Sequence, residues 1–112
     1  FDDKDPYIGE LAKFIKRGGD RPAQLVDRLL LSAMIEARSC ERFKMLSERI
    51  SDEDLRVFYR ELMISEAEHY TTFLGLARKY AGRIDVDARW AEFLEFEGEI
   101  IQSYGKSETI HG

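Results

Sequence analysis

The chain has 112 residues, a formal charge of −5 and a pI near 5.1, with 44% hydrophobic and 35% charged residues. This length allows at most one domain with a modest core, and the acidity argues against nucleic-acid binding by overall charge alone. No apolar run is long enough to span a bilayer, and no signal peptide is recognisable. Because Cys40 is the only cysteine, an internal disulfide is excluded, and we expect a cytoplasmic protein.

Helix start and stop signals predict an all-α chain, and no alternating apolar run favours a strand. The first predicted helix begins at Asp5-Pro6 and ends at Gly18-Gly19. Asp20 is predicted to cap a second helix over residues 21–50, and Ser51 a third over residues 53–81, ended by Gly82. Two helices of nearly thirty residues with a short connection indicate an antiparallel pair in a helical bundle.

The last predicted helix is capped by Asp87 and ends near Tyr104, before Gly105. Residues 106–112 show no hydrophobic periodicity, so we expect an irregular tail on the surface. His111 lies in this tail without a ligand partner at helical spacing, and it carries no functional prediction.

Glu36 lies in the middle of an apolar stripe on the second predicted helix. At about 100° per residue, the positions within roughly 60° of it are mostly apolar or small. The opposite side presents Arg38, Arg42 and Arg49, which we expect to face solvent, where they could steer an anionic partner. The residues of the stripe are Leu25, Leu29, Ser32, Ala33, Cys40, Phe43, Ser47 and Ile50.

The third predicted helix places Glu66 and His69 on its own apolar stripe. These two residues have the i, i+3 spacing that makes side chains neighbours on one helix face. The neighbouring Glu68 is equally acidic but is predicted to point outward. The residues around Glu66 are Leu55, Tyr59, Leu62, Met63, His69, Tyr70, Phe73, Ala77 and Tyr80.

The position along the helix axis gives an independent test of the same grouping. Glu36 lies fifteen residues before Ser51, and Glu66 lies fifteen residues after it. In an antiparallel hairpin with equal rise per residue, their side chains stand at the same height, and His69 is about 4.5 Å further along the axis. We therefore expect Glu36, Glu66 and His69 to meet.

Three such side chains in a dry interior predict a metal ion, because unpaired buried carboxylates cost several kcal/mol each. They match half of a carboxylate-bridged di-iron site, whose full set is two Glu and two Glu-x-x-His pairs. Carboxylate and imidazole ligands suit iron or manganese better than structural zinc. Cys40 is interpreted as a small buried residue, and Tyr59, Tyr70 and Tyr80 as core.

The residues also resemble a known family. The segment Ile35-Glu36-Ala37-Arg38-Ser39-Cys40-Glu41-Arg42-Phe43, with Phe58-Tyr59 and Ser65-Glu66-Ala67-Glu68-His69-Tyr70, resembles the bacterial MiaE-type tRNA hydroxylases, as does the closing Ile110-His111-Gly112. This resemblance runs along nearly the whole chain. It implies a ferritin-like four-helix bundle with a centre of two iron ions.

The resemblance also implies an activity, with partners and residue roles. The family hydroxylates the isopentenyl group of 2-methylthio-N6-isopentenyladenosine, next to the tRNA anticodon, using dioxygen and an external electron donor. By this resemblance Glu36 is a terminal carboxylate ligand, Glu66 a bridging carboxylate and His69 a terminal imidazole. Phe43, Met63 and Phe73 could form walls for the isopentenyl group, although core packing explains them equally well. No membrane partner is implied.

The chain departs from the family by matching only its C-terminal half. A second Glu and a second Glu-x-x-His are missing, and His69 and His111 are the only histidines. Residues 1–112 are therefore a single domain or the C-terminal half of a ferritin-like di-iron domain. We expect a missing N-terminal half, rather than a second copy of the chain, to complete the ligands. The opening Phe1 fits this interpretation, and the chain alone is expected to be inactive.

Two other classes of function stay open. The first is a ferritin- or rubrerythrin-like role in iron oxidation or storage, which uses the same ligands without an organic substrate. The second is a metal-free helical interaction module in which the three side chains form a buried hydrogen-bonded cluster.

Overall fold

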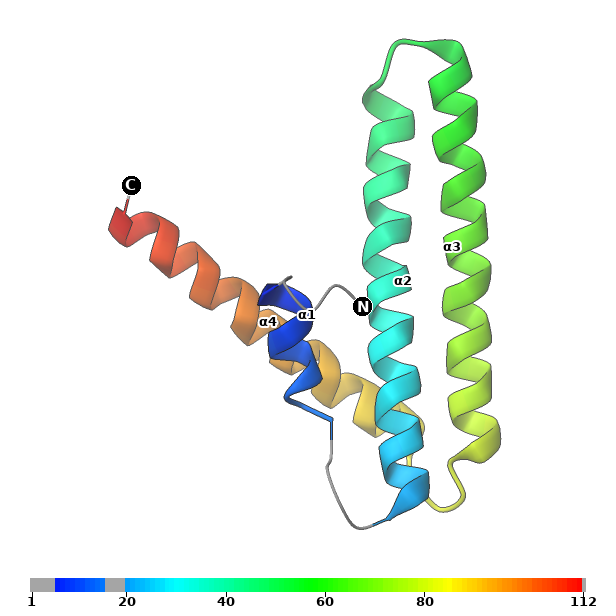
Figure 1. The fold of residues 1–112 in the computed structure, drawn as a ribbon, viewed down its shortest axis with the longest axis vertical. Coiled ribbons are helices and arrows are strands. Elements are labelled where there is room, and N and C mark those ends of the chain that lie inside the picture. Colours follow the sequence, from blue (N-terminus) through cyan, green and yellow to red (C-terminus); the bar gives the residue numbers. More distant parts are fainter. Residues whose placement is uncertain (1–5, 16–19, 112) are drawn as a thin grey trace.

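The computed structural model describes residues 6–15 and 20–111, and within them it contains four helices and no strand. The helices are α1 (Pro6–Ala12), α2 (Arg21–Arg49), α3 (Glu53–Tyr80) and α4 (Val86–His111) (Figure 1). The predicted all-α, ferritin-like class is confirmed, and its central feature is the antiparallel pair α2–α3. None of the described helices is both long and apolar enough to cross a bilayer.

The α2–α3 hairpin closely follows the sequence prediction. The two helices run side by side along their full length, joined by residues 50–52 (Figure 1). The predicted cap Ser51 is wrong by one residue, because the Asp52 carboxylate accepts a hydrogen bond from the Leu55 backbone N–H at 3.0 Å. Gly82, at φ +61°, follows the end of α3 as predicted, in the left-handed conformation that glycine adopts without strain.

The two outer helices differ from the prediction at their ends. Helix α1 ends at Ala12 in a tight turn, and Gly18-Gly19 lie outside the described residues. Helix α4 begins after Asp85, whose side chain accepts from the Ala88 backbone N–H at 3.0 Å, so the predicted cap Asp87 is wrong. Asp87 instead pairs with Arg78 at 3.1 Å.

The predicted irregular tail is wrong as well, because α4 continues to His111. A glycine inside a helix costs only about 1 kcal/mol relative to alanine, whereas a proline removes a backbone hydrogen bond. Gly105 is followed by no proline, so nothing in the sequence forces the helix to stop there.

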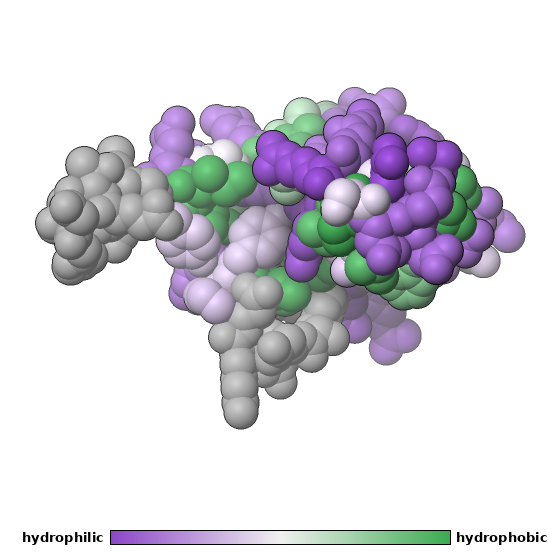
Figure 2. Space-filling model, turned by 90° about the horizontal axis from the view of Figure 1, so that it is seen from above, coloured by the Kyte–Doolittle hydropathy of each residue, from purple (hydrophilic) through white to green (hydrophobic). Residues whose placement is uncertain are grey.

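The hydrophobic core lies where α1 and α4 pack against the N-terminal half of α2. Its fully buried members come from all three helices, whereas α3 contributes mainly Leu74 and Ala77. The distal end of the hairpin leaves large apolar side chains exposed, among them Phe58 and Ile64. Seen from above the hairpin turn, hydrophobic side chains show among the polar ones on the flanks of the hairpin and along α4 (Figure 2). The largest fully buried hydrophobic side chains are Leu11, Val26, Leu30, Leu31, Met34 and Phe93.

Two buried ion pairs attach α4 to α2. Arg89 donates to both oxygens of Asp27, at 2.8 and 2.9 Å, and to the carbonyl of Phe14 at 2.9 Å. Arg38 donates to both oxygens of Glu97, at 2.7 and 2.6 Å, and Tyr7 donates its hydroxyl to the same carboxylate. Such two-point arginine–carboxylate pairs fix orientation as well as contact.

The Arg38–Glu97 pair corrects the sequence analysis, which placed Arg38 in solvent with Arg42 and Arg49. The last two are exposed, but Arg38 faces α4. Burial would raise the pKa of the Glu97 carboxyl, yet hydrogen bonds from Arg38 and Tyr7 outweigh this and hold the pKa below its ordinary value. Burial and the bond to Glu97 raise the pKa of the Tyr7 hydroxyl.

Replacing the two partners of this pair should have unequal effects on stability. Arg38→Met leaves the Glu97 carboxylate buried without its main partner, and we expect a loss of about 3–5 kcal/mol. Glu97→Gln leaves Arg38 partly exposed and still bonded to Glu41, so we expect about 1–3 kcal/mol. Urea unfolding of the purified protein measures both, with Arg42→Met as the exposed control. An Arg38→Met variant as stable as this control would contradict the assignment.

Candidate metal centre

The three residues singled out in the sequence meet on the α2–α3 hairpin. Glu36 comes from the middle of α2, and Glu66 and His69 come from α3, one turn apart. His69 Nδ1 lies 3.7 Å from a carboxylate oxygen of Glu36 and 3.9 Å from one of Glu66. One donor atom from each residue lies within 4.8 Å of the other two. The predicted rotation and height are therefore both confirmed, and the role as metal ligands stays a prediction.

The surroundings of this trio differ from the predicted dry interior. The side chains of Glu36 and Glu66 are 23% and 20% exposed, whereas that of His69 is 56% exposed. The expectation of a shared dry interior is thus wrong for this chain. The physical reason is that α1 and α4 pack beside the N-terminal half of α2, and none of the described elements closes over His69.

The predicted apolar stripes are likewise only partly covered. On α2 the stripe around Glu36 includes the buried Ala33 and Ser47, but Leu25 is 42% exposed. On α3 the stripe around Glu66 includes the buried Ala77, while Leu55 and Tyr80 are exposed. Exposed members of the stripes therefore occur at both ends of the hairpin.

The donor set fits a transition-metal ion. Two donors that bind one ion at about 2.1 Å lie at most about 4.2 Å apart, so small side-chain movements would bring all three atoms within reach. Carboxylate oxygen with imidazole nitrogen is the ligand chemistry of iron and manganese sites in helical bundles. Across the described ranges this trio is the one group of three or more His, Cys, Asp or Glu side chains close enough to hold an ion. In residue type and spacing it matches half of the ligand set of a carboxylate-bridged di-iron site.

The residues around the trio largely lie as the sequence predicted. Glu68 is exposed, as predicted from the rotation of α3. Cys40 is partly buried and directs its thiol to the carbonyl of Met63 at 3.5 Å, which fits a packed residue. Tyr59 stacks on Phe43 with ring centres 6.0 Å apart.

Two of the predictions for residues outside the trio are wrong. Tyr80 is 50% exposed, with the Lys79 ammonium 5.3 Å from its ring centre, so it is not a core residue. His111 belongs to helix α4 rather than to an irregular tail, and its side chain lies outside the described residues.

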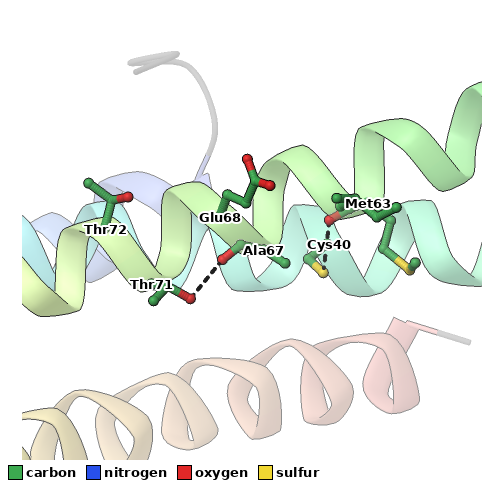
Figure 3. Close-up of a pocket in the computed structure, with 7 residues that line it drawn as sticks. Cys40, Met63, Ala67, Glu68, Thr71 and Thr72 are labelled. Atoms are coloured by element: carbon green, nitrogen blue, oxygen red, sulfur yellow. Dashed lines mark hydrogen bonds between the residues drawn. The ribbon is translucent and has the colours of Figure 1, made fainter.

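A largely apolar groove of about 690 Å³ lies along α3, with Cys40 of α2 at its edge. Figure 3 shows the Cys40 thiol turned toward Met63, and the Thr71 hydroxyl donating to the carbonyl of Ala67. None of the trio lines this groove. Of the three residues suggested as walls for an isopentenyl group, Met63 lines it and Phe43 and Phe73 do not. The lining residues are Cys40, Met63, Ile64, Ala67, Glu68, Thr71 and Thr72.

Comparison with known proteins identifies the protein family that this chain matches. Residues 3–112 match the family model described as tRNA-(MS2IO6A)-hydroxylase (MiaE). The tRNA 2-(methylsulfanyl)-N(6)-isopentenyladenosine(37) hydroxylase of Pseudomonas putida is 45% identical over 106 residues, which cover 94% of this chain and 50% of that protein. The protein of the same name from Salmonella typhimurium is 43% identical over 90 residues, covering 80% of this chain and 33% of that protein.

This chain therefore spans half or less of the length of these curated relatives. No solved structure matches it. The family match extends over nearly every residue, including both helices that carry the trio, and it shows that the chain belongs to the MiaE family.

Proposed function

We propose that this chain provides one half of a non-haem di-iron centre in an oxygen-dependent tRNA hydroxylase. The substrate is the isopentenyl group of 2-methylthio-N6-isopentenyladenosine beside the anticodon. The observation that carries the proposal is the meeting of Glu36, Glu66 and His69 on α2–α3 in a chain of the MiaE family. The names of two relatives, at 43% and 45% identity, support this substrate.

Each member of the trio has a distinct role in this proposal. Glu36 would hold the metal through a terminal carboxylate from α2, and Glu66 would offer a carboxylate that two ions could share. His69 offers Nδ1, the atom that lies closest to both carboxylates, as a terminal ligand. Bound iron would supply the reactivity toward dioxygen, with electrons from an external donor. The hairpin holds the three donor atoms within 4.8 Å of one another.

The remaining ligands must come from outside the trio. A second Glu and a second Glu-x-x-His pair would complete the set, supplied by a further segment or by a second copy of the chain. The length of the relatives supports a further segment. Packing it over the open face would also remove His69 from water, which strengthens electrostatic interactions within the site. Without that cover we expect no hydroxylation.

Recognition of the substrate requires both an accessible base and apolar contacts. Modified bases of single-stranded loops are recognised when they are splayed out of their stack, which suits an anticodon loop. Phe43 and Phe73 lie on the stripes that carry Glu36 and Glu66, and both are partly buried. They stay our candidates for contact with the isopentenyl group. A cytoplasmic location follows from a tRNA substrate.

Two neighbouring glutamates allow a matched test of the metal site. Glu66→Ala removes a ligand carboxylate and should reduce bound iron in the reconstituted protein to near zero. Glu68→Ala removes an exposed carboxylate two residues away and should leave the iron content unchanged. Elemental analysis of both variants measures the difference. Equal iron contents would show that Glu66 is not a ligand.

The proposed reaction is tested on tRNA from cells that lack the gene. Mass spectrometry of the nucleosides should show loss of the hydroxylated isopentenyladenosine and accumulation of its unhydroxylated precursor. A gene copy encoding the intact protein should restore the product, and one encoding the Glu66→Ala variant should not. Unchanged hydroxylation in the deletion strain would reject the reaction. If cellular iron fell in that strain instead, an iron-storage role would be favoured.

A further inference from the structure

Helix α2 carries a row of arginines at seven-residue intervals. Arg21, Arg28, Arg42 and Arg49 occupy this register, and Ile35 takes the middle position. Seven residues fall only about 20° short of two full helical turns, so the row stays on one side of the helix. With the standard rise it extends over about 42 Å. The row therefore follows the entire length of α2.

The arginines of this row are exposed and unpaired. Within residues 6–15 and 20–104, none of them has an ion-pair partner, whereas Arg38, Arg56, Arg78 and Arg89 all do. Exposed arginine side chains without carboxylate partners leave the N–H donors of their planar guanidinium groups available to bind an anion. The row is thus an uncompensated strip of positive charge on a chain whose net charge is −5.

The acidic residues of α2 are kept away from the row. Glu41 and Glu48 lie about 120° or more around the helix from its mean direction, taking about 100° per residue. Asp27 is buried in its pair with Arg89, and Glu36 belongs to the metal-site trio. The positive strip is therefore not neutralised from within its own helix.

By rotation around α2 the row lies about 60–80° from Glu36 at Arg21 and Arg28, and about 120–140° from it at Arg42 and Arg49. Its middle position, Ile35, directly precedes Glu36 in the sequence, so the row passes within one residue of the candidate ligand. Helix α3 presents Asp54, Glu61 and Glu68, which are exposed and also seven residues apart. A polyanion approaching the hairpin would be attracted to the arginine row on α2 and repelled from these acids on α3.

We propose that this arginine row binds the phosphate backbone of the tRNA substrate. The inference rests on the proposed function and adds the surface that holds the RNA beside the metal centre. Charge complementarity carries it, since the remainder of the chain is acidic and the row is the one long basic strip on the described helices. Contacts of this kind supply affinity and position without reading the base sequence.

The row can be tested by a matched pair of double variants. Arg28→Gln with Arg42→Gln removes the two arginines of the row on either side of Ile35. Arg60→Gln with Arg83→Gln removes two arginines that are also exposed, lie outside the row and have no ion-pair partner among residues 6–15 and 20–104. Binding of the purified protein to a fluorescent anticodon stem-loop is measured by anisotropy over a series of salt concentrations.

The row variant should bind the stem-loop about tenfold or more weakly at low salt, with the slope of log affinity against log salt reduced by about 2. The control variant should change neither quantity. Equal effects of the two variants, or no loss in the row variant, would overturn the proposal. Unchanged RNA binding with a lower melting temperature or iron content would instead show that the row contributes to packing between helices. If the protein without substitutions bound no RNA, this proposal would fail, whereas the proposed function is tested separately by the tRNA nucleosides of the deletion strain.

Discussion

The candidate metal centre depends on one electrostatic constraint, which is the close approach of two carboxylates across an antiparallel helix pair. Glu36 and Glu66 stand at the same height because each lies fifteen residues from the turn, and His69 lies one turn further along α3. Like charges held this close repel each other unless a cation or a proton is shared between them. The hairpin therefore keeps in place an arrangement that a metal ion would stabilise.

The remainder of the fold fixes one side of the hairpin and leaves the other open. Two buried ion pairs, Arg89–Asp27 and Arg38–Glu97, hold α4 against α2, and the apolar core lies around them. The two pairs place opposite charges on α4, which contributes an arginine to the first pair and a carboxylate to the second. If α4 ran in the reverse direction, like charges would meet at both points. The pairs thus fix the direction of α4 on α2, and the side that carries the trio stays free for a covering element.

The sequence was sufficient to predict the hairpin and the close approach of the trio, because both follow from the period and rise of an α-helix. Helix ends were less accurate, as at Ser51 and Asp87, because several acidic or hydroxyl side chains near each end can serve as a cap. The solvent-facing assignment of Arg38 failed for a different reason. Its partner Glu97 is 59 residues away, and the phase of α2 alone carries no information about which helix covers it. The same applies to Asp27 and Arg89, 62 residues apart. The exposure of His69 could not be predicted, since it depends on which elements pack over α3.

The most direct test of the central claim is anomalous diffraction at the iron absorption edge from crystals of the iron-loaded protein. We expect an iron peak within bonding distance of Glu36, Glu66 and His69, and a second iron peak that shares the Glu66 carboxylate. An ordered structure in which the iron lies elsewhere, or in which the three side chains bind none, would contradict it.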